Sequence, residues 1–466
     1  MENIDPATGQ VYGSIAAGAQ AEVDRAVEAA NRAFSIWSKM APADRSSRLL
    51  RLADLIDTNL ESLARAESVD TGKPIALARA VDIPRAASNL RYFANAVLHH
   101  HSEAYEHQQG ASRALSYTLR QPRGVAGTIS PWNLPLYLFT WKVAPALATG
   151  NTVVAKPSEV TPVTAHRLAA LSLEADIPPG VFNIVHGRGD EAGAAIVAHP
   201  QIPTITFTGG TATGKHIAAT AAPMFKRLAL ELGGKNPTLV FADCDFETTV
   251  SGATRAAFAN QGQICLCGSR LLIERSIFEK FTDAFVDRVQ SLRQGDPLEE
   301  STQQGAVVSL AHQRKVLNAI DVARQEGGTI LCGGEAAPAP NDRCRTGYFV
   351  KPTVITGLDE HCRTNREEIF GPVVTLMPFD DTDHAIRLAN ATDYGLAASI
   401  WTNNLKRAHH LADRVQAGII WINCWLVRDL RVPFGGMKQS GVGREGGAEA
   451  LHFFTEPKSV CLSLDE

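Results

Sequence analysis

The sequence predicts an α/β fold built on open, largely parallel sheets. Between residues 124 and 233, short apolar runs alternate with helical segments, as a doubly wound sheet requires. A second region of the same kind begins at Leu239. The third observation is a glycine-rich segment, residues 209–214, which follows an apolar run and precedes a helical one. Ligands bind beyond the strand ends of such sheets, so we expect a small-molecule site there.

The first hundred residues are predicted to be mostly helical. Apolar residues recur at helical spacing over residues 23–37, 49–60, 63–69 and 84–97. Arg85 falls in the first turn of the last of these helices. From residue 114 to 123 the apolar residues alternate with polar ones, which predicts a half-exposed strand. An exposed strand edge of this kind can pair with a neighbouring strand.

The alternating regions supply the predicted strands and helices of the two sheets. The first region has predicted strands at residues 124–129, 151–155, 181–185 and 204–208, and predicted helices at 164–175, 191–199 and 215–221. Lys156 and Glu159 follow the end of the second of these strands. The second region has a predicted helix at 277–292 and a predicted strand at 329–332. Glu368 and Phe370 come just before a Gly-Pro turn.

Length, charge and residue spacing argue against a nucleic-acid-binding, metal-binding or membrane protein. At 466 residues the chain is long enough for two or three compact units. A net charge of −4 gives no basic field for nucleic acid or an anionic membrane. The eight cysteines lack zinc-site spacing, and His99 to His101 reads as a solvated helix end rather than a metal site. No apolar run is long enough for a signal core or membrane span, so we expect a soluble, reduced, cytoplasmic protein without a metal.

Three segments carry side chains suited to catalysis. Cys265 follows a Gly-Gln turn, and backbone N–H groups at a helix start would lower the pKa of its thiol. A buried structural cysteine is the alternative. Glu231 lies between two leucines, where a carboxylate has a raised pKa and can act as a general base. Asn133 presents an amide from a turn bracketed by Pro131 and Pro135.

Together these segments resemble the aldehyde dehydrogenase superfamily. The resemblance extends through residues 70–74, 156–159, 207–210, 368–372 and 433–436, and so covers nearly the whole chain. It implies a Rossmann-type NAD-binding domain at residues 1–103 and 124–233 and an α/β catalytic domain at 234–448. It also implies a β oligomerisation arm at 104–123 and 449–466, and therefore a homodimer or homotetramer. The family motif at residues 5–9 usually follows a further strand or two, so we expect a short leading piece to be absent.

The resemblance also assigns catalytic roles. The family pattern Gly-Gln-x-Cys selects Cys265, rather than Cys267, as the nucleophile that attacks the aldehyde carbon. Asn133 and the backbone N–H of Cys265 would stabilise the developing oxyanion. Glu231 would activate the water that hydrolyses the thioester, which argues against a coenzyme-A-acylating relative.

The cofactor implied is NAD. Lys156 and Glu159 would hold the adenosine ribose, where the carboxylate would repel the 2′-phosphate of NADP. Without the resemblance, this pair could equally be a solvated helix cap, and the glycine-rich turn a mere connection. The remaining residues expected to contact the dinucleotide are Trp132, Gly209, Gly210, Gly214, Glu368 and Phe370. Gly210 departs from the serine of many relatives, which removes one hydroxyl contact.

The loop at residues 423–431 indicates the substrate. Arg428 falls where many relatives carry an aromatic residue, and a guanidinium in an aldehyde funnel calls for an anionic partner. With Arg85 it would clamp a carboxylate at the far end of the substrate, as in the muconic semialdehyde branch of the superfamily (2-amino- or 2-hydroxymuconic semialdehyde). The start of the loop favours the amino compound. Alternatives are a structural pair of Arg428 with Asp429 or another protein carboxylate, a broad or betaine-type aldehyde dehydrogenase, and a catalytically silent structural or binding homologue.

Overall fold

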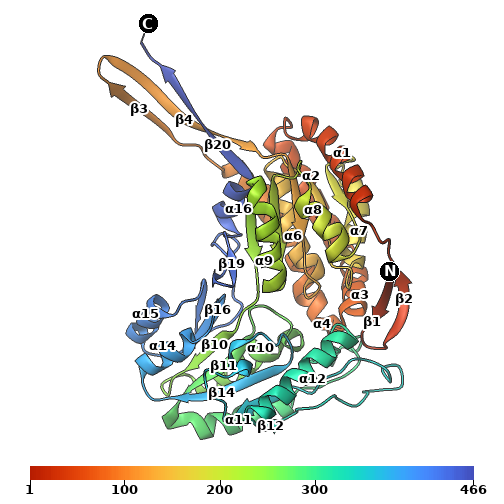
Figure 1. Ribbon diagram of the computed structural model, residues 1–466, viewed down its shortest axis with the longest axis vertical. Helices are drawn as coiled ribbons and strands as arrows, with labels where there is room; N and C mark the ends of the chain where they lie inside the picture. The colour runs from red at the N-terminus through yellow and green to blue at the C-terminus, as the bar shows by residue number, and fades with distance from the viewer. Residues whose placement is uncertain (466) are drawn as a thin grey trace.

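The computed structural model describes residues 1–465; Glu466, the last residue of the predicted arm, lies outside them. Figure 1 shows two α/β lobes and a projecting β arm. The first lobe is built on a six-stranded sheet of order β19-β9-β8-β5-β6-β7. All neighbours are parallel except the short β19, which is antiparallel to β9. The bounds are β5 (Val125–Ile129), β6 (Thr152–Lys156), β7 (Phe182–Ile184), β8 (Thr204–Thr208), β9 (Arg227–Glu231) and β19 (Gly441–Val442).

Helices cover this sheet on both faces, as expected for a buried parallel sheet (Figure 1). They are α1 (Gln20–Trp37), α2 (Pro42–Thr58), α3 (Leu60–Thr71), α4 (Ile75–Leu77), α5 (Ile83–Ala96), α6 (Pro135–Ala148), α7 (Val163–Glu174), α8 (Ala194–Ala198) and α9 (Thr211–Ala221). The four helices predicted in the first hundred residues are confirmed. Helix α6 was not predicted, because all of its residues are buried and apolar periodicity is therefore lost.

The second lobe has a seven-stranded sheet of order β12-β13-β14-β11-β10-β16-β17, parallel except at β12. Its strands are β10 (Asn236–Val240), β11 (Gly268–Glu274), β12 (Thr329–Cys332), β13 (Thr353–Thr356), β14 (Val373–Phe379), β16 (Ala397–Trp401) and β17 (Ile419–Ile422). Its helices are α10 (Phe246–Phe258), α11 (Phe278–Gln290), α12 (Leu310–Gln325), α13 (Arg363–Arg366), α14 (Thr382–Asn390) and α15 (Leu405–Arg414). Helix α16 (Gly447–Phe453) instead packs against α6 of the first lobe and against the C-terminal strand. The predicted second α/β region is confirmed.

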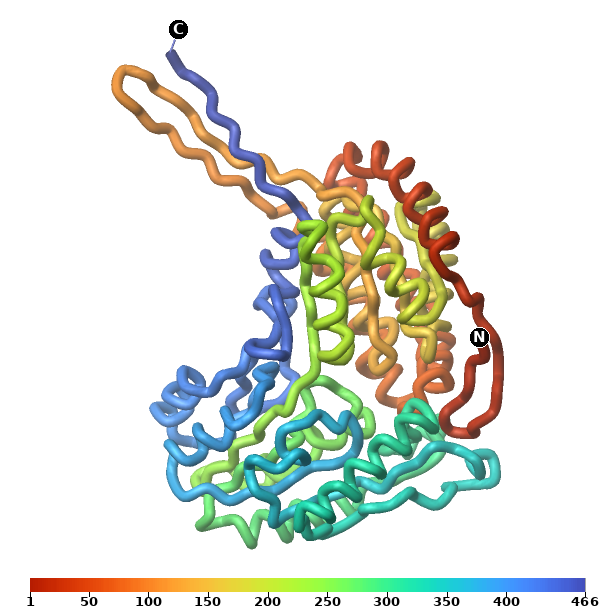
Figure 2. Tube along the Cα trace, in the orientation of Figure 1, coloured from red at the N-terminus to blue at the C-terminus, as the bar shows by residue number. Residues whose placement is uncertain are grey.

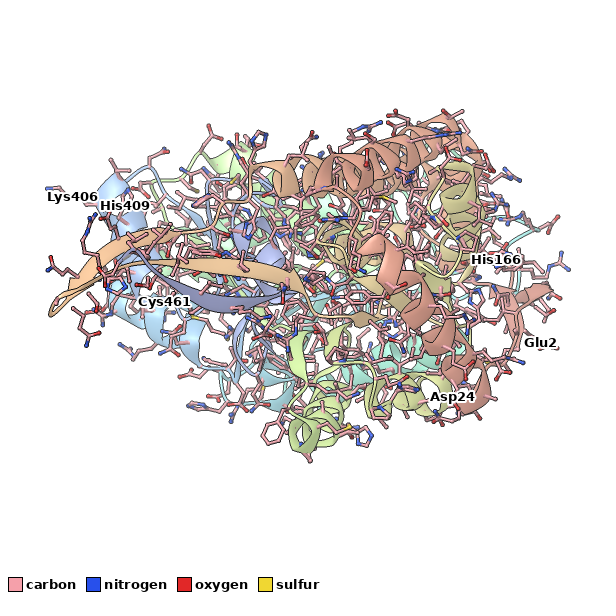
Figure 3. All side chains as sticks on the ribbon, turned by 90° about the horizontal axis from the view of Figure 1, so that it is seen from above. Glu2, Asp24, His166, Lys406, His409 and Cys461 are labelled. Atoms are coloured by element: carbon pink, nitrogen blue, oxygen red, sulfur yellow. The ribbon has the colours of Figure 1, made fainter. Side chains whose placement is uncertain are left out.

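The arm is a three-stranded antiparallel sheet of order β20-β4-β3. Its strands are β3 (Ala104–Gln109), β4 (Ser112–Pro122) and β20 (Thr455–Ser463). The predicted strand at 114–123 is confirmed as β4, and β20 lies within the segment 449–466 that was assigned to the arm. Figure 2 shows β20 running beside the β3–β4 hairpin, and Cys461 is exposed on it (Figure 3). Both outer edges of the arm are free to pair within residues 1–465.

Short strands complete the fold. They are β1 (Glu2–Asp5) with β2 (Gln10–Ser14), and β15 (Tyr394–Gly395) with β18 (Met437–Lys438). The first pair joins the lobes, because Asp5 forms a 2.7 Å salt bridge with Arg343 of the second lobe. The predicted domain bounds remain a prediction, and β19, from the part predicted as catalytic, extends the first sheet. Among the helices of residues 1–465, none has the length and hydropathy needed to cross a membrane.

Candidate active site

Cys265 lies in a turn between the short helix η5 (Ala259–Gly262) and strand β11. Three consecutive residues, Asn260, Gln261 and Gly262, have left-handed φ angles of 52°, 55° and 68°. The glycine is required sterically, because a Cβ at Gly262 would lie 2.0 Å from a carbonyl oxygen of the facing loop. The sequence expectation of a helix start at Cys265 is therefore wrong, and the cysteine lies at the end of a compact left-handed turn.

The pKa of the Cys265 thiol is raised, not lowered as expected. The cause is burial, followed by the negative charges of Glu231 and Glu368, while Arg428 acts weakly in the opposite direction. A buried thiol facing two carboxylates holds its proton more tightly than a free one. The nucleophile therefore needs a base to take that proton as the carbon–sulfur bond forms.

Two side chains hold the cysteine turn in place. The Asn236 amide donates to the carbonyl oxygens of Cys265 and Cys267, at 2.7 and 2.9 Å. The Trp425 indole donates to the carbonyl oxygen of Leu266 at 3.0 Å. These bonds fix the backbone on both sides of the sulfur, so its position is set by the second sheet and by the loop before β18.

Glu231 is the last residue of β9 and is almost fully buried. Burial and the nearby carboxylate of Glu445 raise the pKa of Glu231, although Lys142 and Arg428 oppose this. Glu445 accepts hydrogen bonds from the Lys142 ammonium at 2.7 Å and the Thr206 hydroxyl at 2.9 Å. The raised pKa agrees with the sequence expectation and gives a carboxylate basic enough to take a proton near neutrality.

Asn133 is buried at the turn before α6. One N–H of its side-chain amide donates to the carbonyl oxygen of Gln263 at 2.8 Å. The backbone carbonyl oxygen of Asn133 accepts hydrogen bonds from the Asn260 amide at 3.1 Å and from the Lys73 ammonium at 3.0 Å. A primary amide has two N–H donors, so the second remains for another acceptor.

Cys265 lies where two hollows of the protein meet. One is a narrow cavity of about 60 Å³, whose lining includes Glu231, Cys265, Tyr137, Trp425, Arg428 and Phe434. The other is a cleft of about 200 Å³, whose lining includes Trp132, Asn133, Gly209, Cys265, Glu368 and Phe370. Cys267 lines neither, and instead packs in the hydrophobic core. Of the two candidate cysteines, only Cys265 faces both hollows.

A larger groove of about 550 Å³ lies between α8 and α9, and its lining residues Phe207 and Ala212 are close in sequence to Thr208 and Gly210 of the cleft. At its edge the Lys156 ammonium donates to Glu159 at 2.7 Å, and the backbone N–H of Gly189 also reaches this carboxylate, at 3.4 Å. Burial alone would raise the pKa of Glu159, but the Lys156 charge and the hydrogen bonds from Lys156 and the backbone together outweigh burial and lower that pKa. Glu159 is therefore ionised beside the groove, as a carboxylate that accepts ribose hydroxyl groups should be.

The three predicted glycines fall into two groups. Gly209 and Gly210 line the cleft, and Gly210 is the N-cap of α9. The backbone N–H groups at the start of α9 can therefore bind an anionic group. Gly214 lies inside α9, which begins at Thr211 and not at residue 215 as predicted. A Cβ at Gly214 would lie 2.5 Å from Leu232, which gives this glycine a packing role. Its contact with a cofactor stays a prediction.

The inner end of the cleft is aromatic. The Trp132 ring lies edge-on to Phe370 and His312, with centroids 5.2 and 5.1 Å away. Phe370 has a left-handed φ of 63°, and its carbonyl oxygen accepts a 2.7 Å bond from His312. Burial lowers the pKa of His312 to about 4, so this imidazole is neutral. Glu368, whose pKa is raised by burial, accepts a 2.8 Å bond from the Gly234 N–H.

Arg428 and Arg85 approach the same tyrosine. The Arg428 guanidinium donates to the Tyr137 hydroxyl at 3.0 Å and stacks 4.1 Å from the Trp141 ring centroid and 3.8 Å from that of Phe434. The Arg85 guanidinium lies 5.7 Å from the Tyr137 ring centroid. Arg428 lines the narrow cavity that contains Cys265, whereas Arg85 is not among the residues that line it.

Arg428 has no carboxylate partner among residues 1–465. Its Nε and Nη2 are buried without a hydrogen-bond acceptor in this part of the chain. The neighbouring Asp429 bonds instead to Arg431, at 2.6 to 3.1 Å, and this pairing lowers the pKa of Asp429 to about 2. The alternative of an Arg428–Asp429 pair is therefore wrong. No group of three or more potential metal ligands occurs in the described chain.

Comparison with known proteins identifies the family. The sequence profile of the aldehyde dehydrogenase family matches residues 1–460. The chain belongs to this family. The 2-aminomuconic semialdehyde dehydrogenase of Danio rerio is 51% identical over 463 residues, which cover 99% of this chain and 95% of the relative. The 2-hydroxymuconic semialdehyde dehydrogenase of Pseudomonas sp. (strain CF600) is 46% identical, with coverage of 100% and 96%.

Solved structures agree with the fold of this aldehyde dehydrogenase. The NAD+ complex of an aldehyde dehydrogenase from Bacillus cereus has a TM-score of 0.96 at 42% identity, and the match covers 100% of this chain and 93% of that one. The predicted family and fold class are thus confirmed.

The sequence patterns did not identify several residues that lie at the active site of this aldehyde dehydrogenase. Lys142 and Glu445 lie behind Glu231, and His312 and Lys315 line the cleft. Lys142 had a usable signal, since it is the one charged residue in the otherwise apolar run 134–148. Arg255, an exposed residue of α10, lines the narrow cavity that contains Cys265, with its guanidinium 5.9 Å from the Trp425 ring centroid. It was missed because helical periodicity places it on the solvent-facing side of the helix.

Proposed function

We propose that this aldehyde dehydrogenase oxidises a carboxylate-bearing semialdehyde to the corresponding acid, with NAD as the oxidant. The observation that carries the proposal is the position of Cys265 between the cleft lined by Trp132, Glu368 and Phe370 and a cavity that contains an unpaired guanidinium. A sulfur in that position can bond to an aldehyde carbon from one hollow while a second reactant occupies the other.

The chemistry follows from the groups around the sulfur. The Cys265 sulfur bonds to the aldehyde carbon, its proton passes to Glu231, and the carbonyl oxygen becomes an oxyanion. The free N–H of the Asn133 amide and the Cys265 backbone N–H stabilise this oxyanion, and one such donor contributes about 3–4 kcal/mol in comparable sites. NAD, when bound, accepts the hydride that leaves the carbon, and a thioester remains.

Hydrolysis then releases the product. Glu231, again ionised after losing its proton to solvent, takes a proton from water, and the water oxygen bonds to the thioester carbon. The carbon–sulfur bond breaks, Glu231 passes the proton it took from water to the Cys265 sulfur, and the acid leaves. The raised pKa of Glu231 suits this role, because a weakly basic carboxylate would not deprotonate water effectively.

The residues of the cleft and groove fit NAD. The ionised Glu159 can accept both hydroxyl groups of a ribose and would repel a 2′-phosphate. The start of α9 offers backbone N–H groups to a pyrophosphate. Trp132, Phe370 and Glu368 surround the end nearest Cys265, where a nicotinamide and its ribose belong.

The carboxylate specificity rests on Arg428, with Arg85 as the second cation. The unpaired Nε and Nη2 of Arg428 form a fork whose geometry matches a carboxylate. The relatives named for 2-aminomuconic and 2-hydroxymuconic semialdehydes support a substrate of this type. We favour the 2-amino compound. A broad or betaine-type aldehyde dehydrogenase is disfavoured, since a cationic substrate would be repelled by Arg428.

The assembly and compartment are further parts of the proposal. The arm, with two free edges in the described chain, supports pairing between protomers and hence a homodimer or homotetramer. Light scattering of the purified protein tests this, and a monomer would contradict it. A nucleophilic thiol must stay reduced, which favours the cytoplasm.

Absorbance at 340 nm tests the activity directly. We expect NADH to form with 2-aminomuconate semialdehyde and, more slowly, with an uncharged aldehyde of the same length such as 2,4-hexadienal. NAD should be preferred to NADP in parallel assays. A protein that binds NAD but oxidises no aldehyde of the panel would instead be the silent homologue.

A further inference from the structure

A buried ion pair lies directly behind the turn that carries Asn133. Lys73, Asp82 and Glu67 are all fully buried. The Lys73 ammonium donates to the Asp82 carboxylate and, at 3.0 Å, to the Asn133 carbonyl oxygen, while Glu67 is 3.9 Å away. Lys73 therefore links a buried counter-ion to the backbone of the residue whose amide faces the reacting oxygen.

The same region ties the Asn133 turn to the cysteine turn. The Asn260 amide donates to the Asn133 carbonyl oxygen, which is also the acceptor for Lys73. The Asn133 amide donates in return to Gln263. The Gln261 amide donates to the carbonyl oxygen of Gly72 at 3.3 Å, one residue before Lys73. The two turns that supply the oxyanion donors are thus both bonded to the 72–73 segment.

Asp82 connects this network with the aldehyde cavity. It ends the π-helical turn η1 (Ala78–Asp82), which leads directly into α5. Asp82 also lines the narrow cavity that contains Cys265, and Arg85 follows Asp82 by three positions in the sequence. π-helical turns interrupt regular hydrogen bonding and often occur at functional sites. The ion pair therefore joins the oxyanion turn to the helix that carries the second proposed substrate cation.

We propose that Lys73 is a positioning residue, which holds the Asn133 amide and the Cys265 backbone N–H at the separation that one oxyanion requires. The inference rests on the proposed function, because it presupposes those two donors. A buried ammonium–carbonyl bond is strong in a low-dielectric interior and resists displacement of its acceptor. An ion pair kept only for packing could be replaced by apolar side chains. Here the ammonium makes an additional bond, and that bond ends on Asn133.

The test variant is Lys73→Met, whose unbranched side chain is one atom shorter and lacks the ammonium. We expect kcat to fall about 100-fold, since a displacement of about 1 Å at a reacting centre has effects of this size. The KM for aldehyde and for NAD should change less than threefold. The rate at which iodoacetamide alkylates Cys265, followed by peptide mass mapping, should stay the same, because alkylation forms no oxyanion.

Two further variants separate positioning from stability. Ser68→Ala removes a 2.7 Å bond from the Ser68 hydroxyl to the Lys73 carbonyl oxygen, so it disturbs the same turn without touching the ammonium. We expect its kcat to stay within twofold of the parent. The double variant Lys73→Met with Asp82→Asn also removes the carboxylate left alone by the first change. We expect its melting temperature to recover toward the parent value while kcat stays low.

The results for these variants distinguish failure of the Lys73 proposal from failure of the proposed function. A Lys73→Met enzyme with parental kcat would overturn the inference, and so would a double variant whose kcat recovers with its melting temperature. Equal losses in turnover and in alkylation of Cys265 would also overturn it, because they would indicate general damage to the site. If Lys73→Met does not fold, the double variant decides alone. A Cys265→Ala enzyme that still oxidises the aldehyde would instead contradict the proposed function itself.

Discussion

Replacing Arg428 is the most direct test of how this aldehyde dehydrogenase selects its substrate. The guanidinium has two buried donors, Nε and Nη2, that lack an acceptor within residues 1–465. Each charge-assisted hydrogen bond is worth about 1.5–3 kcal/mol. Because two bonds to one carboxylate are not additive, we take about 3 kcal/mol for the pair, which corresponds to about 150-fold in kcat/KM.

The assay compares two substrates and two variants. We expect Arg428→Ala to lower kcat/KM about 150-fold for 2-aminomuconate semialdehyde. The loss for 2,4-hexadienal should be a few-fold, through the small effect of this charge on the pKa values of Glu231 and Cys265. Arg431→Ala is the matched control, since this exposed arginine of the same loop is bonded to Asp429. Equal losses on both substrates would refute the carboxylate fork.

Three further predictions concern the reaction and the cofactor. Cys265→Ala should abolish NADH formation, whereas Cys267→Ala should retain most of it; the reverse result would identify the wrong nucleophile. Glu231→Gln should form NADH only slowly in stopped flow, because the base that takes the Cys265 proton is lost, and should then stall as the acyl-enzyme after about one NADH per site. In the parent, the hydrolysis rate should rise with pH as Glu231 ionises through its raised pKa, and this rise should vanish in the variant. Glu159→Gln should increase kcat/KM with NADP relative to NAD about tenfold, through loss of a negative charge beside the ribose; an unchanged ratio would mean that Glu159 does not select the cofactor.

The sequence predicted the parts of the site that depend on local pattern. Alternation of strands and helices located four strands of the first sheet, and with them the strand end that carries Lys156. Strand β9, whose end carries Glu231, was not predicted. Resemblance in short motifs brought Cys265 and Asn133 together. The structure places these segments around shared hollows, although the motifs are separated by more than a hundred residues of sequence.

Features that depend on tertiary contacts could not be predicted. The left-handed Asn260 and Gln261 are not glycines, so nothing local indicated the turn that displaces Cys265 from a helix start. The sign of the Cys265 pKa shift depends on Glu231 and Glu368, which reach the sulfur from distant elements. Lys142 and Glu445 are 303 residues apart, and only folding makes them partners.

The surroundings of Arg428 explain how a buried charge can be kept available for a ligand. A protein carboxylate would stabilise the guanidinium, but it would also occupy the fork that recognises the substrate. The faces of Trp141 and Phe434 stabilise the cation by about 2 kcal/mol each when desolvated, without using its N–H groups. Only Nη1 is committed, to the Tyr137 hydroxyl, and the fork formed by Nε and Nη2 stays open. Because aromatic faces replace a counter-ion here, a substrate carboxylate can satisfy the fork without first displacing an internal partner, and an uncharged aldehyde leaves it unsatisfied.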